Sequence, residues 1–101
     1  SMIYDKHGQE QLPISIENGL GSKGRLKILR AMTRNPHNSF TRYQLQQSTR
    51  LNATGVKADL NTLIRVGWVK EYPFEPRKYQ IELENPIVSQ IVEFFKHIGY
   101  I

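Results

Sequence analysis

The sequence predicts a mainly α-helical domain that carries a small β-hairpin and ends in one more helix. Apolar residues recur at helical spacing over three segments between residues 22 and 67, the spacing changes to that of β-strands after Gly67, and helical spacing returns after Pro86. A chain of 101 residues forms one domain with a small core. We therefore expect an N-terminal arm at residues 1–19, a central domain at 20–85 and a C-terminal helix at 86–101.

The composition is that of a folded globular protein, with 39% hydrophobic and 23% charged residues. The chain has no cysteine, and its histidines, His7, His37 and His97, are not spaced as metal ligands. We therefore expect no disulfide, metal site or cofactor. No apolar run approaches the roughly 18 residues that span a bilayer, and the first ten residues lack the apolar segment of a signal peptide. This favours a cytoplasmic protein without membrane contact.

Positive charge is concentrated in the middle of the chain. Residues 22–65 contain nine basic residues against Asp59 alone, a net charge of +8, whereas the remainder carries five basic and eight acidic residues, a net charge of −3. The whole chain therefore has a net charge of +5. One basic region on a mildly acidic protein is typical of nucleic-acid binding, but an ordinary solvated basic surface explains the charge equally well.

The N-terminal arm shows no sustained period, and we expect extended chain with one short strand around Ile14 and Ile16. The first helix is expected from Ser22, as N-cap, to Asn35, where Asn35-Pro36 ends it. Its apolar face contains Leu26, Ile28, Leu29, Ala31 and Met32. Its opposite face carries a cationic stripe, which consists of Lys23, Lys27, Arg30 and Arg34. A solvated helix face is the simpler interpretation of this stripe.

The segment from Thr41 to Gly67 is expected to form a short supporting helix, a turn and a longer helix. Thr41 and Gln44 have the spacing of a capping box, and Asn52 or Thr54 caps the longer helix. Helical spacing directs one set of residues to the core: Val56, Leu60, Leu63 and Gly67. The same geometry points another set outward: Thr54, Ala58, Asn61 and Arg65, flanked by Gly55, Lys57 and Thr62. This outer face is the candidate recognition surface.

Two further elements follow. Residues 68–72 and 78–83 alternate as the strands of a hairpin around a turn at 73–76. Asn85 as N-cap and Pro86 at the first helical position then begin the last helix. Its apolar residues form two rows, Ile87, Ile91, Phe94 and Ile98 in one and Val88, Val92 and Phe95 in the other. The domain's own core needs one row, so we expect the other to contact a second subunit in a homodimer. Alternatively, the small core covers both rows.

These residues resemble those of winged helix-turn-helix transcriptional regulators of the ArsR/MarR-like kind, particularly the small archaeal ones. The resemblance covers roughly residues 20–83 and is carried by GSKGRLKILRAM, by FTRYQLQQSTRLNATGVKADLNTLIRVGWVKEY and by KYQI. It implies a helix-turn-helix whose third helix enters the major groove of double-stranded DNA, a hairpin wing along the DNA backbone, and dimerisation through terminal helices. The sequence departs from the family pattern at Arg50, where such turns usually have glycine, and at Gly55 inside the recognition helix.

The chemistry of DNA recognition divides the candidate residues into two groups. We expect four residues in the first half of the recognition helix to read base edges in the major groove: Thr54, Lys57, Ala58 and Asn61. We expect the surrounding cations to contact the DNA backbone: Arg42, Arg50, Arg65, Arg77 and Lys78.

Two other classes of function fit the sequence less well than DNA binding. Winged helices also serve as protein–protein interaction modules, and Asp59 on the edge of a modestly basic recognition helix is compatible with that role. An enzyme is disfavoured, because the sequence shows no acid pair, nucleophile–base pair, phosphate loop or ligand cluster. The sequence identifies no small-molecule effector.

Overall fold

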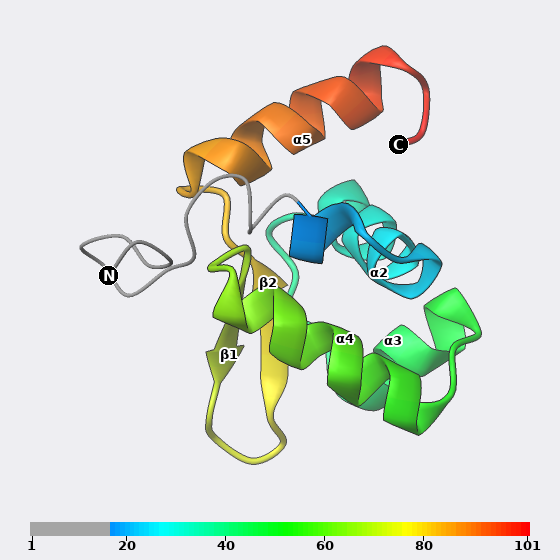
Figure 1. The fold of residues 1–101 in the computed structure, drawn as a ribbon. Coiled ribbons are helices and arrows are strands. Elements are labelled where there is room, and N and C mark those ends of the chain that lie inside the picture. The colour runs from blue at the N-terminus through cyan, green and yellow to red at the C-terminus, as the bar shows by residue number, and fades with distance from the viewer. Residues whose placement is uncertain (1–16) are drawn as a thin grey trace.

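The computed structural model describes residues 17–101 as a mainly helical domain with one two-stranded antiparallel hairpin (Figure 1). The elements are α2 (Lys23–Arg34), α3 (Arg42–Thr49), α4 (Ala53–Arg65), β1 (Val69–Tyr72), β2 (Lys78–Ile81) and α5 (Pro86–His97). In Figure 1, α2 lies between α5 on one side and α4 on the other, and the hairpin extends beside α4 away from α5. The predicted fold class and order of elements are confirmed.

Most of the predicted arm lies outside the described residues. Its last part, residues 17–19, belongs to a helical turn over residues 17–20, so extended chain is the wrong expectation there. Gly19 in this turn packs on the indole of Trp68 so closely that an added Cβ would lie 2.2 Å from the ring. The turn therefore covers a core residue, which the local sequence did not reveal.

Side-chain caps begin the helices at the predicted residues. The Ser22 hydroxyl accepts a hydrogen bond from the Arg25 amide at 3.0 Å at the start of α2. Thr41 and Gln44 form both hydrogen bonds of the capping box at α3. Asn52, rather than Thr54, caps α4 and accepts from the Gly55 amide at 2.7 Å. Local side-chain chemistry thus sets where these three helices begin.

The turn between α3 and α4 depends on a left-handed residue. Arg50 has φ 63° and ψ 18°, and its amide donates to the Gln46 carbonyl to end α3. A side chain in this conformation costs about 1 kcal/mol relative to glycine. Arginine in place of the usual glycine therefore destabilises the backbone conformation of this turn.

The hairpin pairs Val69 with Ile81 and Tyr72 with Lys78, and it is shorter than predicted only at its open end, opposite the turn. Trp68 precedes β1 because its amide donates to the Leu63 carbonyl and so completes the end of α4. Glu82 follows β2 because its carbonyl accepts from the Asn85 amide in a turn. Phe40 and Tyr79 exchange two backbone hydrogen bonds of 2.8 Å, which fasten the hairpin to the chain entering α3.

The core combines residues from every element. Its fully buried members include Ile28, Leu29 and Met32 of α2, Leu45 of α3, Leu60 and Leu63 of α4, and Trp68. From α5 it takes Val88, Ile91, Val92 and Phe95, whereas Phe94 and Ile98 are each 57% exposed and Ile87 is half-buried. This corrects the expected division into two rows, because Ile91 packs inward with the other row. The surface that α5 offers to a second subunit is reduced to Ile87, Phe94 and Ile98.

Asn85 joins α5 to the corner between α4 and β1. Its Oδ1 accepts from the Ile87 amide at 2.9 Å as the N-cap, and its Nδ2 donates to the Gly67 carbonyl at 3.1 Å. The residue is buried. One side chain therefore satisfies partly buried backbone groups at two places in the chain, Gly67 and Ile87.

We predict that Asn85→Ala lowers the free energy of unfolding by about 2 kcal/mol, because it removes the cap and leaves the Gly67 carbonyl without its side-chain donor. Urea denaturation followed by circular dichroism measures this change. Asn38→Ala is the matched control, since Asn38 is exposed and donates only through its backbone amide. Equal stability of the two variants would contradict the proposed role of Asn85.

Candidate nucleic-acid interface

The outer face of α4 gathers the four predicted base-reading residues. Val56, Leu60 and Leu63 are buried on the inner face. The opposite face exposes Thr54, Lys57, Ala58 and Asn61, all in the first nine residues of the helix. Small side chains on an exposed helix face let the helix backbone come close to a groove of DNA, and polar side chains offer hydrogen-bonding groups to the base edges at the floor of the groove. The structure brings these four residues together, and their base-reading role stays a prediction.

Arg42 extends this surface onto α3. A shallow hollow between α3 and the start of α4 is lined by Arg42, Gln46, Ala53, Thr54 and Lys57. Its lining contains two cations and no acidic residue. The positive end of the α4 helix dipole lies beside it. The hollow therefore favours an anionic group next to the predicted base-reading residues.

Asp59, the single acidic residue of α4, is directed at α2. Its carboxylate lies 3.5 Å from the Arg25 guanidinium. Burial raises the pKa of Asp59, and the charge of Arg25 and the hydrogen bond with it partly oppose that rise. A raised pKa means that this group contributes stability below about pH 4 and loses that contribution as pH rises through its folded pKa. The Asp59 carboxylate therefore lies against Arg25 of α2 rather than at the centre of the outer face of α4.

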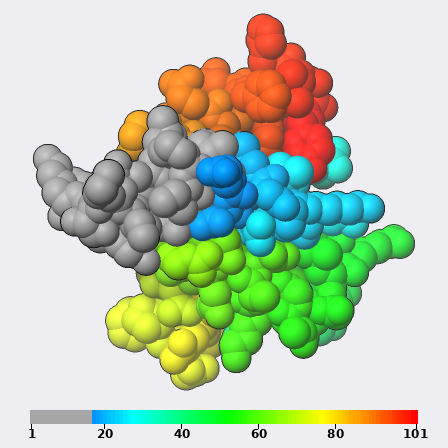
Figure 2. All heavy atoms as spheres, in the orientation of Figure 1, coloured from blue at the N-terminus to red at the C-terminus, as the bar shows by residue number. Residues whose placement is uncertain are grey.

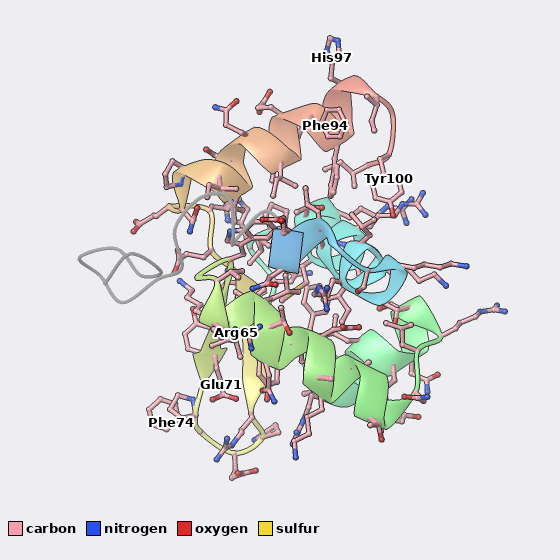
Figure 3. The ribbon with its side chains drawn as sticks, viewed as in Figure 1. Arg65, Glu71, Phe74, Phe94, His97 and Tyr100 are labelled. Carbon is pink, nitrogen blue, oxygen red and sulfur yellow. The ribbon has the colours of Figure 1, made fainter. Side chains whose placement is uncertain are left out.

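The other predicted backbone contacts are exposed but lie at different ends of the surface. Arg50 is at the turn before α4, and Arg65 is at the end of the helix, beside the hairpin in Figure 3. The 13 residues of α4 separate them by roughly 20 Å along the helix axis. Arg50, Arg42 and Lys57 therefore surround the first half of α4, whereas Arg65 belongs to the hairpin side.

The hairpin carries less free positive charge than its basic residues suggest. Arg77 lies 3.7 Å from the carboxylate of Glu71, and Lys78 is exposed beside it. Burial, together with a hydrogen bond from Tyr79 to Glu71, raises the pKa of Tyr79. Glu71 is therefore engaged inside the hairpin by both neighbours, and it offsets part of the attraction that Arg77 has for a phosphate.

Two exposed aromatic residues beside this surface were not predicted as site residues. Phe74 at the hairpin tip is 78% exposed, and Tyr43 on α3 is 67% exposed (Figure 3 shows Phe74). A hollow between α3 and the hairpin is lined by Thr41, Arg42, Tyr43, Glu75, Pro76 and Arg77. The position of Tyr43, two residues before the buried Leu45 on a short helix, was the sequence signal for its exposure.

The cationic stripe of α2 lies elsewhere. Lys27, Arg30 and Arg34 line a hollow that they share with Tyr100. Figure 3 shows Tyr100 between the end of α5 and α2, on the side of α2 away from α4 and the hairpin. In Figure 2 the α4 and hairpin side likewise lies below α2, and the end of the chain lies above it. The stripe and the outer face of α4 therefore point to different sides of the domain.

Residues 17–101 contain neither a metal-binding cluster nor a helix that could span a membrane. No group of three or more His, Asp or Glu side chains in this part of the chain is arranged to hold a metal ion. Among its helices, none is both long and apolar enough to cross a membrane.

Solved structures share this arrangement at low sequence identity. The homodimeric winged helix-turn-helix DNA-binding domain from Mycobacterium bovis, a possible ArsR-family transcriptional regulator, matches with a TM-score of 0.66 and 19% identity over 86% of this chain and 77% of that one. An ArsR-family transcriptional regulator matches with a TM-score of 0.60 and 16% identity over 89% and 94%. A possible transcriptional regulator from Methanosarcina mazei matches with a TM-score of 0.60 and 16% identity over 87% and 82%.

At the level of sequence, no protein-family model and no curated protein matches the chain. The structural likeness, at this identity, establishes the fold. The chain has the winged helix-turn-helix fold seen in ArsR-family regulators, with α3 and α4 as the helix-turn-helix and the β1–β2 hairpin as the wing.

Proposed function

We propose that this protein is a transcriptional regulator that binds double-stranded DNA sequence-specifically, with α4 in the major groove and the hairpin along the backbone. The observation that carries the proposal is the outer face of α4, where Thr54, Lys57, Ala58 and Asn61 are exposed together. An α-helix fits the major groove of B-DNA, and an exposed helix of this length reaches several base pairs. The similar domain from Mycobacterium bovis, which is a DNA-binding domain, supports the same use of the fold.

Each of the four residues contacts a different group on the DNA, according to the chemistry of its side chain. Asn61 pairs with adenine through its amide, and Lys57 donates to guanine or to a phosphate. Thr54 and Ala58 contact the methyl group of thymine. Arg42 and Arg50 bind phosphates on either side of the turn, while Arg65 and Lys78 do so near the hairpin. In this arrangement affinity comes from the surrounding cations and sequence preference comes from α4.

We further propose that the protein acts as a homodimer through α5. Phe94 and Ile98 are one helical turn apart and both are 57% exposed, with Ile87 half-buried on the same helix. The similar domain from Mycobacterium bovis is homodimeric. Two copies would then present two α4 helices to half-sites one turn of DNA apart.

A protein–protein interaction module is the second candidate, and it is favoured by the exposed aromatic residues. Tyr43 and Phe74 line two hollows that share Glu75, an acidic residue that a protein partner tolerates better than a phosphate backbone does. Sequence-specific binding separates the two candidates, because a basic protein-binding module attracts random duplex at low salt through charge alone but prefers no DNA site.

We predict that Arg42→Gln reduces the dependence of DNA affinity on salt. Removing one phosphate contact lowers the slope of log K against log salt concentration by about 1. Fluorescence anisotropy with random duplex DNA over a range of salt measures this slope. Lys96→Gln is the matched control, since it makes the same charge change on the exposed side of α5. An absence of binding even at low salt would refute the DNA proposal, and an unchanged slope would remove Arg42 from the interface.

We predict that Asn61→Ala relaxes sequence preference. Selection of bound sequences from a random DNA pool first supplies the preferred site, which we expect to be a palindrome with half-sites about one helical turn apart. On that site the variant loses about 1–3 kcal/mol of binding free energy, while its affinity for random DNA and its salt slope stay nearly constant. Asn38→Ala, which removes an exposed amide outside both α4 and α5, is the control. An equal loss on both DNAs would show that Asn61 does not read a base.

We predict that the double variant Phe94→Gln, Ile98→Gln is monomeric where the parent protein is dimeric. Sedimentation velocity at tens of micromolar measures the change, because the substitutions remove the apolar contact of α5. Phe74→Gln removes a comparably exposed aromatic side chain from the hairpin tip and should leave the dimer intact. A parent protein that sediments as a monomer at this concentration would refute the homodimer.

A further inference from the structure

The cationic stripe of α2 lines a hollow that the proposed DNA surface does not use. The hollow has a volume of about 340 Å³ and is formed by the outer face of α2, the end of α3 and the end of the chain. Its lining consists of Lys27, Arg30, Ala31, Arg34, Asn35, Phe40, Ser48, Thr49 and Tyr100. This is the size of a small-molecule site.

The charges in this hollow have no counter-charge among residues 17–101. Lys27, Arg30 and Arg34 follow one another at intervals of three and four residues, so they share one helix face. No acidic residue is part of the lining. Lys27 and Arg34 form neither a hydrogen bond nor an ion pair with the described residues. Three like charges around one concave surface repel one another, and a bound anion relieves that repulsion.

Arg30 is held in place before any ligand arrives. Its Nε donates to the Tyr100 carbonyl at 2.8 Å, and its guanidinium lies 4.7 Å from the centre of the Tyr100 ring. That ring packs edge-on against Phe95 of the core at 4.9 Å. The arginine is therefore fixed to Tyr100, a half-buried residue that packs on the core, and a fixed guanidinium loses little side-chain entropy on binding an anion.

The rest of the lining indicates the kind of molecule that would fit. Phe40, Ala31 and the ring of Tyr100 supply apolar and aromatic surface, and Ser48 and Asn35 supply neutral hydrogen-bonding groups. Two arginines and a lysine suit a doubly charged phosphate better than a carboxylate with a single charge. A ligand with a phosphate group and a planar apolar ring satisfies both parts of the lining.

We propose that this hollow is a binding site for a small phosphate-bearing molecule with an aromatic ring, such as a mononucleotide. The site is distinct from the proposed DNA interface, because none of its lining residues lies on α4 and it shares none with the hollow beside Arg42 and Lys57. The two surfaces come nearest at the end of α3, where Thr49 of this site precedes Arg50. The proposal does not depend on the DNA proposal, and either can fail alone.

To test the site, the full chain is titrated with adenosine monophosphate and with phenyl phosphate. Binding is monitored through the amide chemical shifts in NMR spectra. We expect saturable shifts at residues of α2, at Ser48 and Thr49, and at Tyr100. Lys27→Gln together with Arg34→Gln should weaken binding at least tenfold, and Lys27→Gln alone should weaken it less. Arg42→Gln and Lys57→Gln make the same charge change on the α4 side and should leave it unchanged. Thermal unfolding of each variant verifies that it is folded.

Three results would overturn the site. The first is an absence of saturable shifts with both ligands at millimolar concentration. The second is an affinity that Arg42→Gln and Lys57→Gln lower as much as the α2 variants do, which would place the phosphate on the α4 surface. The third is equal binding of adenosine, which would exclude recognition of the phosphate. Lys27→Gln should change the affinity for random duplex DNA less than twofold, because Lys27 lies outside the proposed DNA interface.

Discussion

The corner between α4 and β1 is the constraint on which the arrangement of the other elements depends. Gly67 turns the chain with φ 83°, the Trp68 amide closes the end of α4 on the Leu63 carbonyl, and Asn85 holds the Gly67 carbonyl from α5. Trp68 itself is fully buried. The corner thus fixes the hairpin relative to α4 and the start of α5 relative to both, so that α4, the hairpin and α5 form one rigid unit.

Within this unit, charge is distributed unevenly for physical reasons. The acidic residues near the outer face are engaged by basic neighbours, Asp59 by Arg25 and Glu71 by Arg77. The basic residues around the first half of α4 are exposed, and one of them, Arg50, adopts a strained backbone conformation. A cation at this turn therefore coincides with a cost in stability, which is the pattern expected where a residue is kept for binding rather than for folding.

Local interactions explain which parts of the fold and site were predictable. Helix starts depend on caps a few residues apart, and the two faces of α4 follow from helical spacing, so Ser22, Thr41 and the exposed position of Asn61 were predicted correctly. The burial of Ile91 in the core and the side of the domain on which the cationic stripe of α2 lies were not predicted. Both depend on where distant segments of the chain pack. The Arg77–Glu71 pair and the covering of Trp68 by Gly19 likewise require tertiary structure.

Gly24 lies where α2 comes close to α4. A Cβ added at Gly24 would lie 2.3 Å from the Asp59 carboxylate, so the glycine leaves the room in which this carboxylate meets Arg25. A larger residue would push the end of the Asp59 side chain aside and disturb its contact with Arg25. A substitution on α2 can therefore set free an acidic group on α4 without altering any residue of α4.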